Sequence, residues 1–190
     1  MMSKLVAPVL AVLALTAAAC GEITRLKAAL PTGRDSTVIY ALNGAPPGAP
    51  TAIYLPTESV VRADGNFQFD VAFDIDANGK VVLLPLRTVA TDLSTTYRVG
   101  LQTSSLSFDS LLTAPKSGYH YDSTLVVTPG TTVVVETQNV NACGLSYVGS
   151  TMYAKVIVDS VQAASRLLYT RFVVDPNCGF YSLAEGVPKE

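Results

Sequence analysis

Short apolar and β-branched runs recur along most of the chain, and Gly, Pro, Asn and Asp separate them. The clearest run alternates two sets of side chains: Phe67, Phe69, Val71, Phe73 and Ile75 in one, and Gln68, Asp70, Ala72, Asp74 and Asp76 in the other. A period of two residues is typical of a β-strand with one buried face and one face in solvent. We therefore expect an antiparallel strand here whose aspartates face solvent.

The same reasoning predicts strands at residues 36–42, 51–55, 59–62, 66–75, 80–88, 97–103, 121–127, 131–138, 152–161 and 166–174. Turn signals separate several of them, such as Asn78-Gly79 and Pro129-Gly130. Many short strands without intervening helices predict an all-β fold, a single antiparallel β-sandwich. We expect one domain over residues 36–190, with an immunoglobulin-like arrangement favoured.

The beginning of the chain has a different pattern. Lys4 precedes an apolar run over residues 5–15, which ends in Ala17-Ala18-Ala19-Cys20. The run is shorter than the roughly 20 apolar residues that span a bilayer, and its positive start and small-residue end are typical of a signal peptide. Residues 17–20 resemble the lipobox of bacterial lipoproteins, although Ala17 stands where that family usually has Leu.

This resemblance implies a lipoprotein signal peptide over residues 1–19, a lipid with acyl chains such as palmitate on Cys20, and a lipidated tether over residues 20–35. It implies anchoring in a bacterial cell envelope. Many lipoproteins retained in the inner membrane have Asp after the cysteine, so Gly21 favours the outer membrane or the cell surface. The alternative is ordinary secretion that leaves Cys20 as an unmodified first residue, an exposed reactive thiol.

Composition narrows the functions of the mature chain. Without residues 1–19 the chain has 171 residues, enough for one domain with a substantial core. Its 12 Lys and Arg residues are scattered among 15 acidic residues, a net charge of about −3. A nucleic-acid partner would require a basic patch, so we do not expect one. The membrane, through the lipid, and an envelope protein are the expected partners.

The remaining cysteines are Cys143 and Cys178. With Cys20 lipidated they form an even pair in an oxidising compartment, so we expect a disulfide between them. Metal binding or redox chemistry is the alternative. A single histidine and the lack of any Cys-x-x-Cys motif disfavour it.

A calcium site is the sharpest chemical candidate. Asp74, Asp76 and Asn78, followed by Gly79, resemble the start of a calcium loop, in which alternate oxygen ligands wrap a hard cation. Pro85 stands where the bidentate Glu would be, and the predicted flanks are strands. A hairpin turn with solvent-facing carboxylates explains the same residues without a metal. No other cofactor is expected.

No catalytic residue can be assigned. His120 is the single histidine and the necessary general base of any histidine-dependent hydrolase, but no nucleophile is evident. Residues 144–149 contain Gly-x-Ser, with the second Gly one place late for a nucleophile elbow. The sequence therefore favours a noncatalytic envelope protein that binds a partner or contributes to envelope structure. The alternative is a cation-dependent ligand-binding domain or envelope hydrolase that uses Asp70, Asp74 and Asp76.

Tyrosines are concentrated in the second half of the chain, and tryptophan is absent. The positions concerned are Tyr119, Tyr121, Tyr147, Tyr153, Tyr169 and Tyr181. Tyrosine suits binding surfaces, and it equally suits the edges and cores of sheets. Both uses stay open.

Overall fold

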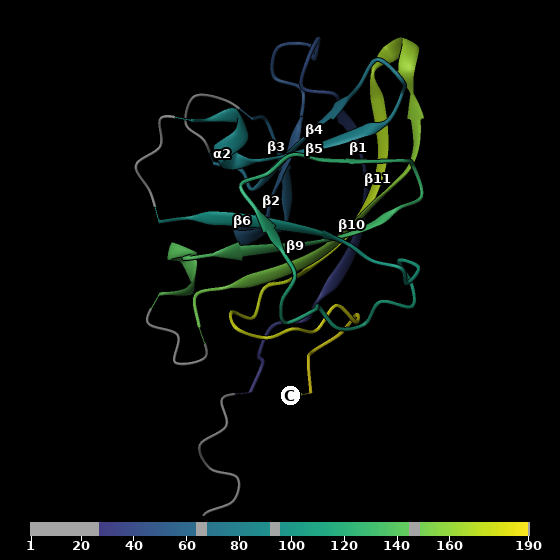
Figure 1. The fold of residues 1–190 in the computed structure, drawn as a ribbon. Coiled ribbons are helices and arrows are strands. Elements are labelled where there is room, and N and C mark those ends of the chain that lie inside the picture. Colours follow the sequence, from purple (N-terminus) through teal and green to yellow (C-terminus); the bar gives the residue numbers. More distant parts are fainter. Residues whose placement is uncertain (1–26, 64–67, 92–95, 145–148, 190) are drawn as a thin grey trace, which may run out of the picture.

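The computed structural model describes residues 27–63, 68–91, 96–144 and 149–189, and it has two antiparallel sheets packed face to face (Figure 1). One sheet has six strands in the order β1-β11-β10-β9-β6-β7, and the other has five in the order β3-β2-β4-β5-β8. This arrangement confirms the predicted all-β sandwich.

The six-stranded sheet contains β1 (Gly33–Tyr40), β6 (Arg98–Thr103), β7 (His120–Tyr121), β9 (Thr132–Gln138), β10 (Met152–Gln162) and β11 (Leu167–Asp175). The five-stranded sheet contains β2 (Ala52–Tyr54), β3 (Ser59–Val61), β4 (Val71–Ile75), β5 (Val81–Pro85) and β8 (Leu125–Val127). The short helical elements are η1 (Leu55–Thr57), α2 (Leu86–Val89), η2 (Asn141–Cys143) and η3 (Ala163–Ser165).

The main core lies between the sheets. Alternate residues of β9 and β10, among them Val135 and Val156, belong to the same buried cluster as Phe73 and Leu83 of the five-stranded sheet. Phe73 and Leu83 are paired neighbours on β4 and β5 and therefore share a face. The alternation seen in the sequence thus supplies the core-facing side chains.

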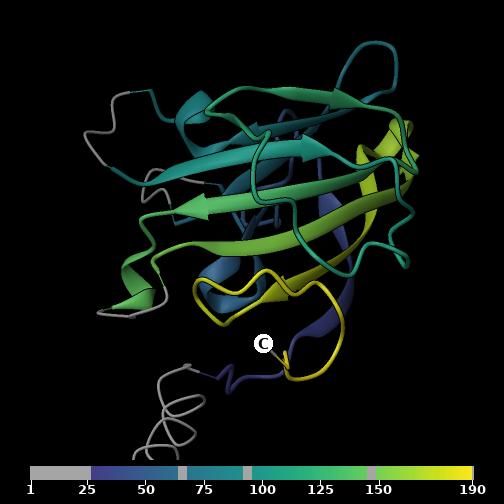
Figure 2. The same ribbon diagram turned by 60° about the horizontal axis from the view of Figure 1, so that its bottom comes forward.

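Two segments without regular strands cover the outer face of the six-stranded sheet. Phe108, from the segment after β6, packs against Ile157 and Val173, and Leu183, from the C-terminal segment, joins a cluster with Val134. A bridge between Thr113 and Ser182 ties the two segments to each other, and Figure 2 shows both of them against this sheet. This cover buries most of β9, and β10 as far as Val158, on both faces.

The folded domain begins earlier than predicted. The tether was expected to reach Asp35, but β1 starts at Gly33 and pairs with β11 from there. Thr32 forms a bridge with Gly186, and Ala28 is already buried. The prediction missed this start because residues 28–33 lack an alternating pattern and are held by pairing with distant segments.

Two predicted strands need correction. The strand over residues 121–127 is in fact two, because β7 ends at Tyr121 and β8 belongs to the other sheet. Asp122 turns the chain between them with a positive φ of 51°. The strand over residues 80–88 ends at Pro85, since proline has no N–H to continue the ladder, and α2 begins at Leu86.

The solvent-facing side predicted for the strand at 66–75 is wrong for Asp70, Ala72 and Asp74, although Gln68 is exposed. Every residue of β4 is buried, Asp70 is 0% exposed and Asp74 is 7% exposed. β4 lies in the interior of its sheet, between β2 and β5. The chain around Leu42 approaches it as well, with the Leu42 N–H donating to the Phe73 carbonyl at 2.7 Å. Residues 66 and 67 lie outside the described part of the chain.

Candidate functional site

The predicted disulfide between Cys143 and Cys178 is confirmed. The two Cα atoms are 5.7 Å apart, within the usual range for a disulfide, and the bond joins η2 to the segment after β11. A backbone hydrogen bond of 2.8 Å from Gly179 to Thr151 holds the same region. The bond therefore fastens the beginning of the C-terminal segment to the loop between β9 and β10.

The predicted lipidation site, Cys20, lies outside the described residues, as does the signal segment before it. The first described residue is Lys27. The lipidation of Cys20 therefore stays a prediction from the sequence. In the described ranges, the structure contains no helix long and apolar enough to cross a membrane.

Asp70 lies in a buried polar network that joins the two sheets. Its Oδ2 accepts a hydrogen bond of 2.7 Å from the Leu55 N–H, and its Oδ1 accepts from Tyr97 and Thr137 at 2.5 and 2.8 Å. Burial raises the pKa of Asp70 to about 6, against the opposing effect of these hydrogen bonds. The same burial and the nearby carboxylate raise the pKa of Tyr97.

Asp74 forms an ion pair with Arg166. Nη2 of Arg166 donates to Oδ1 of Asp74 at 2.5 Å, and Asn43 donates to the other carboxylate oxygen. The Ile75 N–H also donates to Oδ1, at 2.8 Å. Both oxygens of this carboxylate therefore have protein partners, and the side chain ties β4 to the turn before β11.

Asp76 organises the turn between β4 and β5. Its Oδ1 accepts hydrogen bonds of 2.8 Å from the N–H groups of Asn78 and Lys80, and the Lys80 N–H lowers the pKa of Asp76. Gly79 follows with a φ of +76°, as this turn requires.

The three aspartates thus have separate partners and do not form a common site. Within the described ranges, no group of three or more His, Cys, Asp or Glu side chains is placed to hold a metal ion. The observed contacts favour the hairpin turn over the calcium site predicted from Asp74, Asp76 and Asn78.

His120 is exposed on β7, an edge strand, where it pairs with Leu101 through the backbone. The neighbouring Asp122 lies 3.1 Å from Arg98 and 3.6 Å from Arg87 instead of orienting the histidine. The Gly-x-Ser serine, Ser146, lies outside the described residues. The structure therefore brings no nucleophile–histidine–carboxylate arrangement together from the residues it describes.

Four of the tyrosines gather on the outer face of the six-stranded sheet. Tyr119, Tyr121, Tyr153 and Tyr181 form a chain of tilted ring pairs with centroids 4.7 to 6.4 Å apart. The Tyr121 hydroxyl donates to the buried carboxylate of Glu136. Tyr119 and Tyr153 are almost fully buried. The cluster therefore packs the two covering segments onto the sheet, which favours the packing use of these residues.

Gly100 is required beside this cluster. A Cβ at this position would lie 2.9 Å from Cβ of Tyr119 and 2.9 Å from the Tyr121 ring. Any larger residue would push these rings off the strand.

The two other tyrosines of the second half lie outside this cluster. Tyr169 is 41% exposed on β11, and Tyr147 lies outside the described residues.

A cationic group around Phe108 was not expected from the sequence. Arg34, Lys155 and Arg171 each lie over the Phe108 ring, at 5.3, 4.8 and 5.0 Å from its centroid. The buried Nζ of Lys155 donates to the carbonyls of Phe108 and Leu111, both at 2.8 Å. Lys155 therefore fastens the segment after β6, and its only sequence signal is that it interrupts the apolar run from Met152 to Val158.

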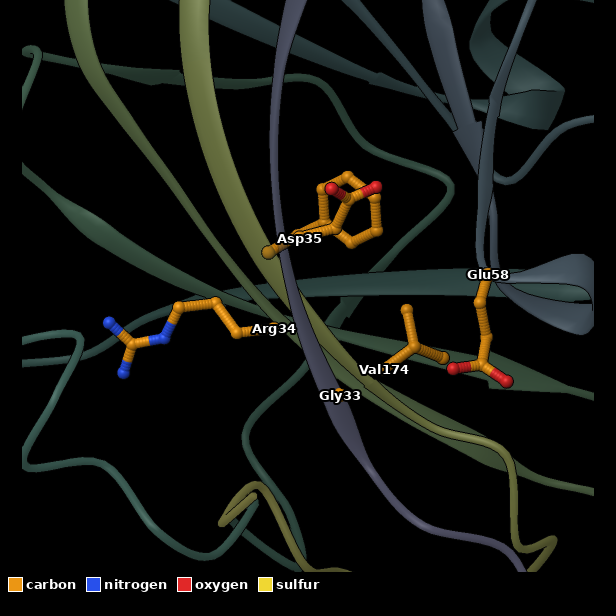
Figure 3. A pocket seen from close by; sticks show the side chains of 6 residues that line it. Gly33, Arg34, Asp35, Glu58 and Val174 are labelled. Carbon is orange, nitrogen blue, oxygen red and sulfur yellow. The ribbon is translucent and has the colours of Figure 1, made fainter. Parts of the chain in front are cut away.

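A small pocket of about 180 Å³ lies between β1, β11 and Glu58, the residue between η1 and β3. Glu58 extends toward Val174 in this pocket, and Arg34 extends in the opposite direction (Figure 3). Asp35 also lines it, and burial, with a smaller effect of Asp175, raises the pKa of Glu58. The pocket is acidic and too small for a drug-sized ligand.

Comparison of the chain with known protein families, curated proteins and solved structures gives no match. Fold and site are therefore interpreted from this chain alone. The immunoglobulin-like arrangement stays a prediction, since the sheets have six and five strands against four and three in a constant-type immunoglobulin domain.

Proposed function

We propose that this chain is a noncatalytic, lipid-anchored protein of a bacterial cell envelope. Its β-sandwich would bind a partner or contribute to envelope structure. The observation that carries the proposal is the signal-like segment that ends in Ala17-Ala18-Ala19-Cys20. The tether between Cys20 and the domain is short, which would hold the domain close to the membrane.

Two features of the structure support this proposal. The disulfide between Cys143 and Cys178 suits a compartment outside the reducing cytosol. The carboxylates that a hydrolase or cation site would use are engaged elsewhere: Asp70 joins the sheets, Asp74 pairs with Arg166, and Asp76 holds a turn. Structural roles for these groups favour the noncatalytic function over the alternative.

The experiment that tests the proposal is crosslinking of the tagged protein in living cells, compared with a Cys20→Ala variant that cannot be anchored. We expect the wild type to fractionate with membranes and to enrich one dominant envelope protein, and the variant to lose both properties. Equal behaviour of the two proteins would refute the anchor. An anchored protein without any enriched neighbour would refute the partner-binding role.

The placement in the outer membrane is tested separately. It rests on Gly21, because the lipoprotein resemblance assigns inner-membrane retention to Asp at that position. Gly21→Asp should therefore move the anchored protein from the outer to the inner membrane fraction. If both proteins are found in the inner membrane, the anchor stands and the outer-membrane placement is wrong.

A further inference from the structure

The end of the domain from which the chain leads back to Cys20 exposes large apolar side chains. Leu30 is 52% exposed, Val187 is 51% exposed and Leu112 is 54% exposed. Thr32 and Gly186 pair through two backbone hydrogen bonds of 2.9 Å, which places the segments of Leu30 and Val187 side by side. The Leu112 carbonyl accepts from Leu183 of the same C-terminal segment at 2.8 Å. The three side chains therefore belong to segments that are hydrogen-bonded to one another at this end of the domain.

Leu30 is held in place by a buried side chain. The Leu30 N–H donates to Oδ1 of Asn177 at 3.0 Å, and Nδ2 of Asn177 donates to the Leu30 carbonyl at 2.8 Å. Asn177 is itself 7% exposed and bonded to the buried Asp175. The backbone of Leu30 is thus fixed, and its exposed side chain is part of the ordered fold and does not result from fraying of the chain end.

Lysines surround the apolar side chains. Lys27, Lys116 and Lys189 are exposed, and none of them has an ion-pair partner among the residues that the structure describes. Two nearby acids share one cation, because Arg34 pairs with Asp109 at 2.7 Å and with Glu185 at 2.8 Å. These three groups leave a net charge of −1 against the +3 of the lysines. A surface with exposed apolar side chains among lysines that lack ion-pair partners suits an anionic membrane, because the apolar groups enter the interface and the lysines attract the headgroups.

The position of Cys20 identifies the surface that this end would meet. Lys27 is the seventh residue after Cys20, and this length of chain reaches at most about 25 Å. Figures 1 and 2 both show the first described residues and the C-terminus at the same end of the domain. A lipid on Cys20 would therefore keep Lys27 within that distance of the bilayer, and it would hold this end of the domain nearest to the membrane.

We propose that Leu30, Leu112 and Val187, with Lys27, Lys116 and Lys189, form a membrane-facing end that docks on the anionic phospholipid headgroups of the anchoring membrane. This inference rests on the proposed function, because it needs the lipid on Cys20. Docking fixes the orientation of the domain. The β10–β11 hairpin, at the opposite end in Figure 1, then points away from the membrane and toward any partner.

The test uses the full lipidated protein in vesicles of phosphatidylcholine with and without phosphatidylglycerol. Leu112→Cys and Val187→Cys, made separately, carry an environment-sensitive fluorophore, and spin-labelled lipid is the quencher. Val126→Cys is the matched control, because Val126 is 49% exposed on β8 of the other sheet. We expect a blue shift and quenching at 112 and 187 with the anionic lipid, and neither at 126.

Charge reversal provides the second comparison. Lys27→Glu, Lys116→Glu and Lys189→Glu together should reduce quenching at position 187 at least about twofold. Lys80→Glu, in the exposed turn between β4 and β5, should leave it unchanged. Equal reduction by both variants would show a general charge effect and would overturn the proposed surface.

The outcomes separate the two proposals. If mass spectrometry finds the lipid on Cys20 but positions 112 and 187 stay unquenched, the docking surface is wrong and the anchor stands. Equal quenching at positions 126 and 187 would mean that the domain has no fixed orientation on the membrane, and this result would also overturn the docking surface. Crosslinking of position 187 to a protein in native membranes would assign this end to a protein partner instead. Absence of the lipid from Cys20 would refute the proposed function itself.

Discussion

The hydroxyl of Thr137, on β9, donates a hydrogen bond of 2.8 Å to Oδ1 of Asp70, immediately before β4. This contact spans the two sheets of the sandwich. Asp70 is completely buried and also accepts a hydrogen bond from the Leu55 N–H. A buried carboxylate that holds several donors specifies how the sheets fit together, and it gives the stability of the domain a pH dependence.

We predict that the wild type gains stability relative to Asp70→Asn as the pH falls from 7 to 4.5. The pKa of Asp70 is about 6 in the folded protein, above its ordinary value of 3.8, so the folded state binds the proton more tightly than the unfolded state. Protonation between these values therefore stabilises the fold, by about 2 kcal/mol over this interval. Urea unfolding of both proteins at the two pH values measures the change.

The comparison with Asn isolates this group. Carboxylates with a lowered pKa, such as Asp159 beside Arg171, act in the opposite direction below pH 4, and they are common to both proteins. A difference in unfolding free energy that stays constant between pH 4.5 and 7 would show that Asp70 does not titrate in this range. A difference that grows with pH in favour of the wild type would reverse the sign and contradict the buried carboxylate.

The ion pair between Asp74 and Arg166 should contribute to stability. Removing either side chain leaves the other without its partner in a partly covered site, where solvent screening is reduced but not absent. We expect a coupling energy of about 1–2 kcal/mol from a double-mutant cycle of Asp74→Asn and Arg166→Met. Additive effects of the two substitutions would show that the pair contributes nothing.

Calcium should leave the melting temperature unchanged. Asp76 uses Oδ1 to accept from two N–H groups of its own turn, and Asp74 is occupied by Arg166. Asp76→Ala should lower the melting temperature equally with calcium and with a chelator, whereas Asp76→Asn should keep most of the turn because an amide oxygen accepts the same bonds. If calcium raises the melting temperature of the wild type and both variants lose this increase, the prediction is wrong and Asp76 belongs to a cation site.

The disulfide should supply a large part of the stability. It closes a loop with a sequence separation of 35 residues, for which the chain-entropy model gives about 4 kcal/mol. We expect the Cys143→Ala, Cys178→Ala double variant to unfold at a correspondingly lower urea concentration, and a reducing agent to affect only the wild type. Equal unfolding midpoints for the two oxidised proteins would contradict a stabilising bond.

Much of the fold follows from local pattern. The apolar and β-branched runs of β9 and β10 and the turn residues between strands predict where the strands lie, because such side chains pack well in sheets. The disulfide follows from the number of cysteines once Cys20 is assigned to the lipid. Neither inference needs long-range information, and the structure confirms both the sandwich and the bond.

What the sequence did not predict depends on distant segments. Asp70 looked like a solvent-facing residue because its partners, Thr137 and Tyr97, are far away in the chain. The burial of Lys155 likewise depends on the segment after β6, which folds back over the sheet and offers two carbonyls. A period of two distinguishes one face of a strand from the other, but it does not reveal whether the second face is covered.

The most direct test of the account is the intact mass of the protein purified from bacterial membranes. A chain that begins at Cys20 and carries a lipid on that residue is the predicted result, and the Cys20→Ala variant should lack this lipid. A mature protein that begins at an unmodified Cys20, or at another residue, would contradict the lipid anchor and with it the envelope function proposed here.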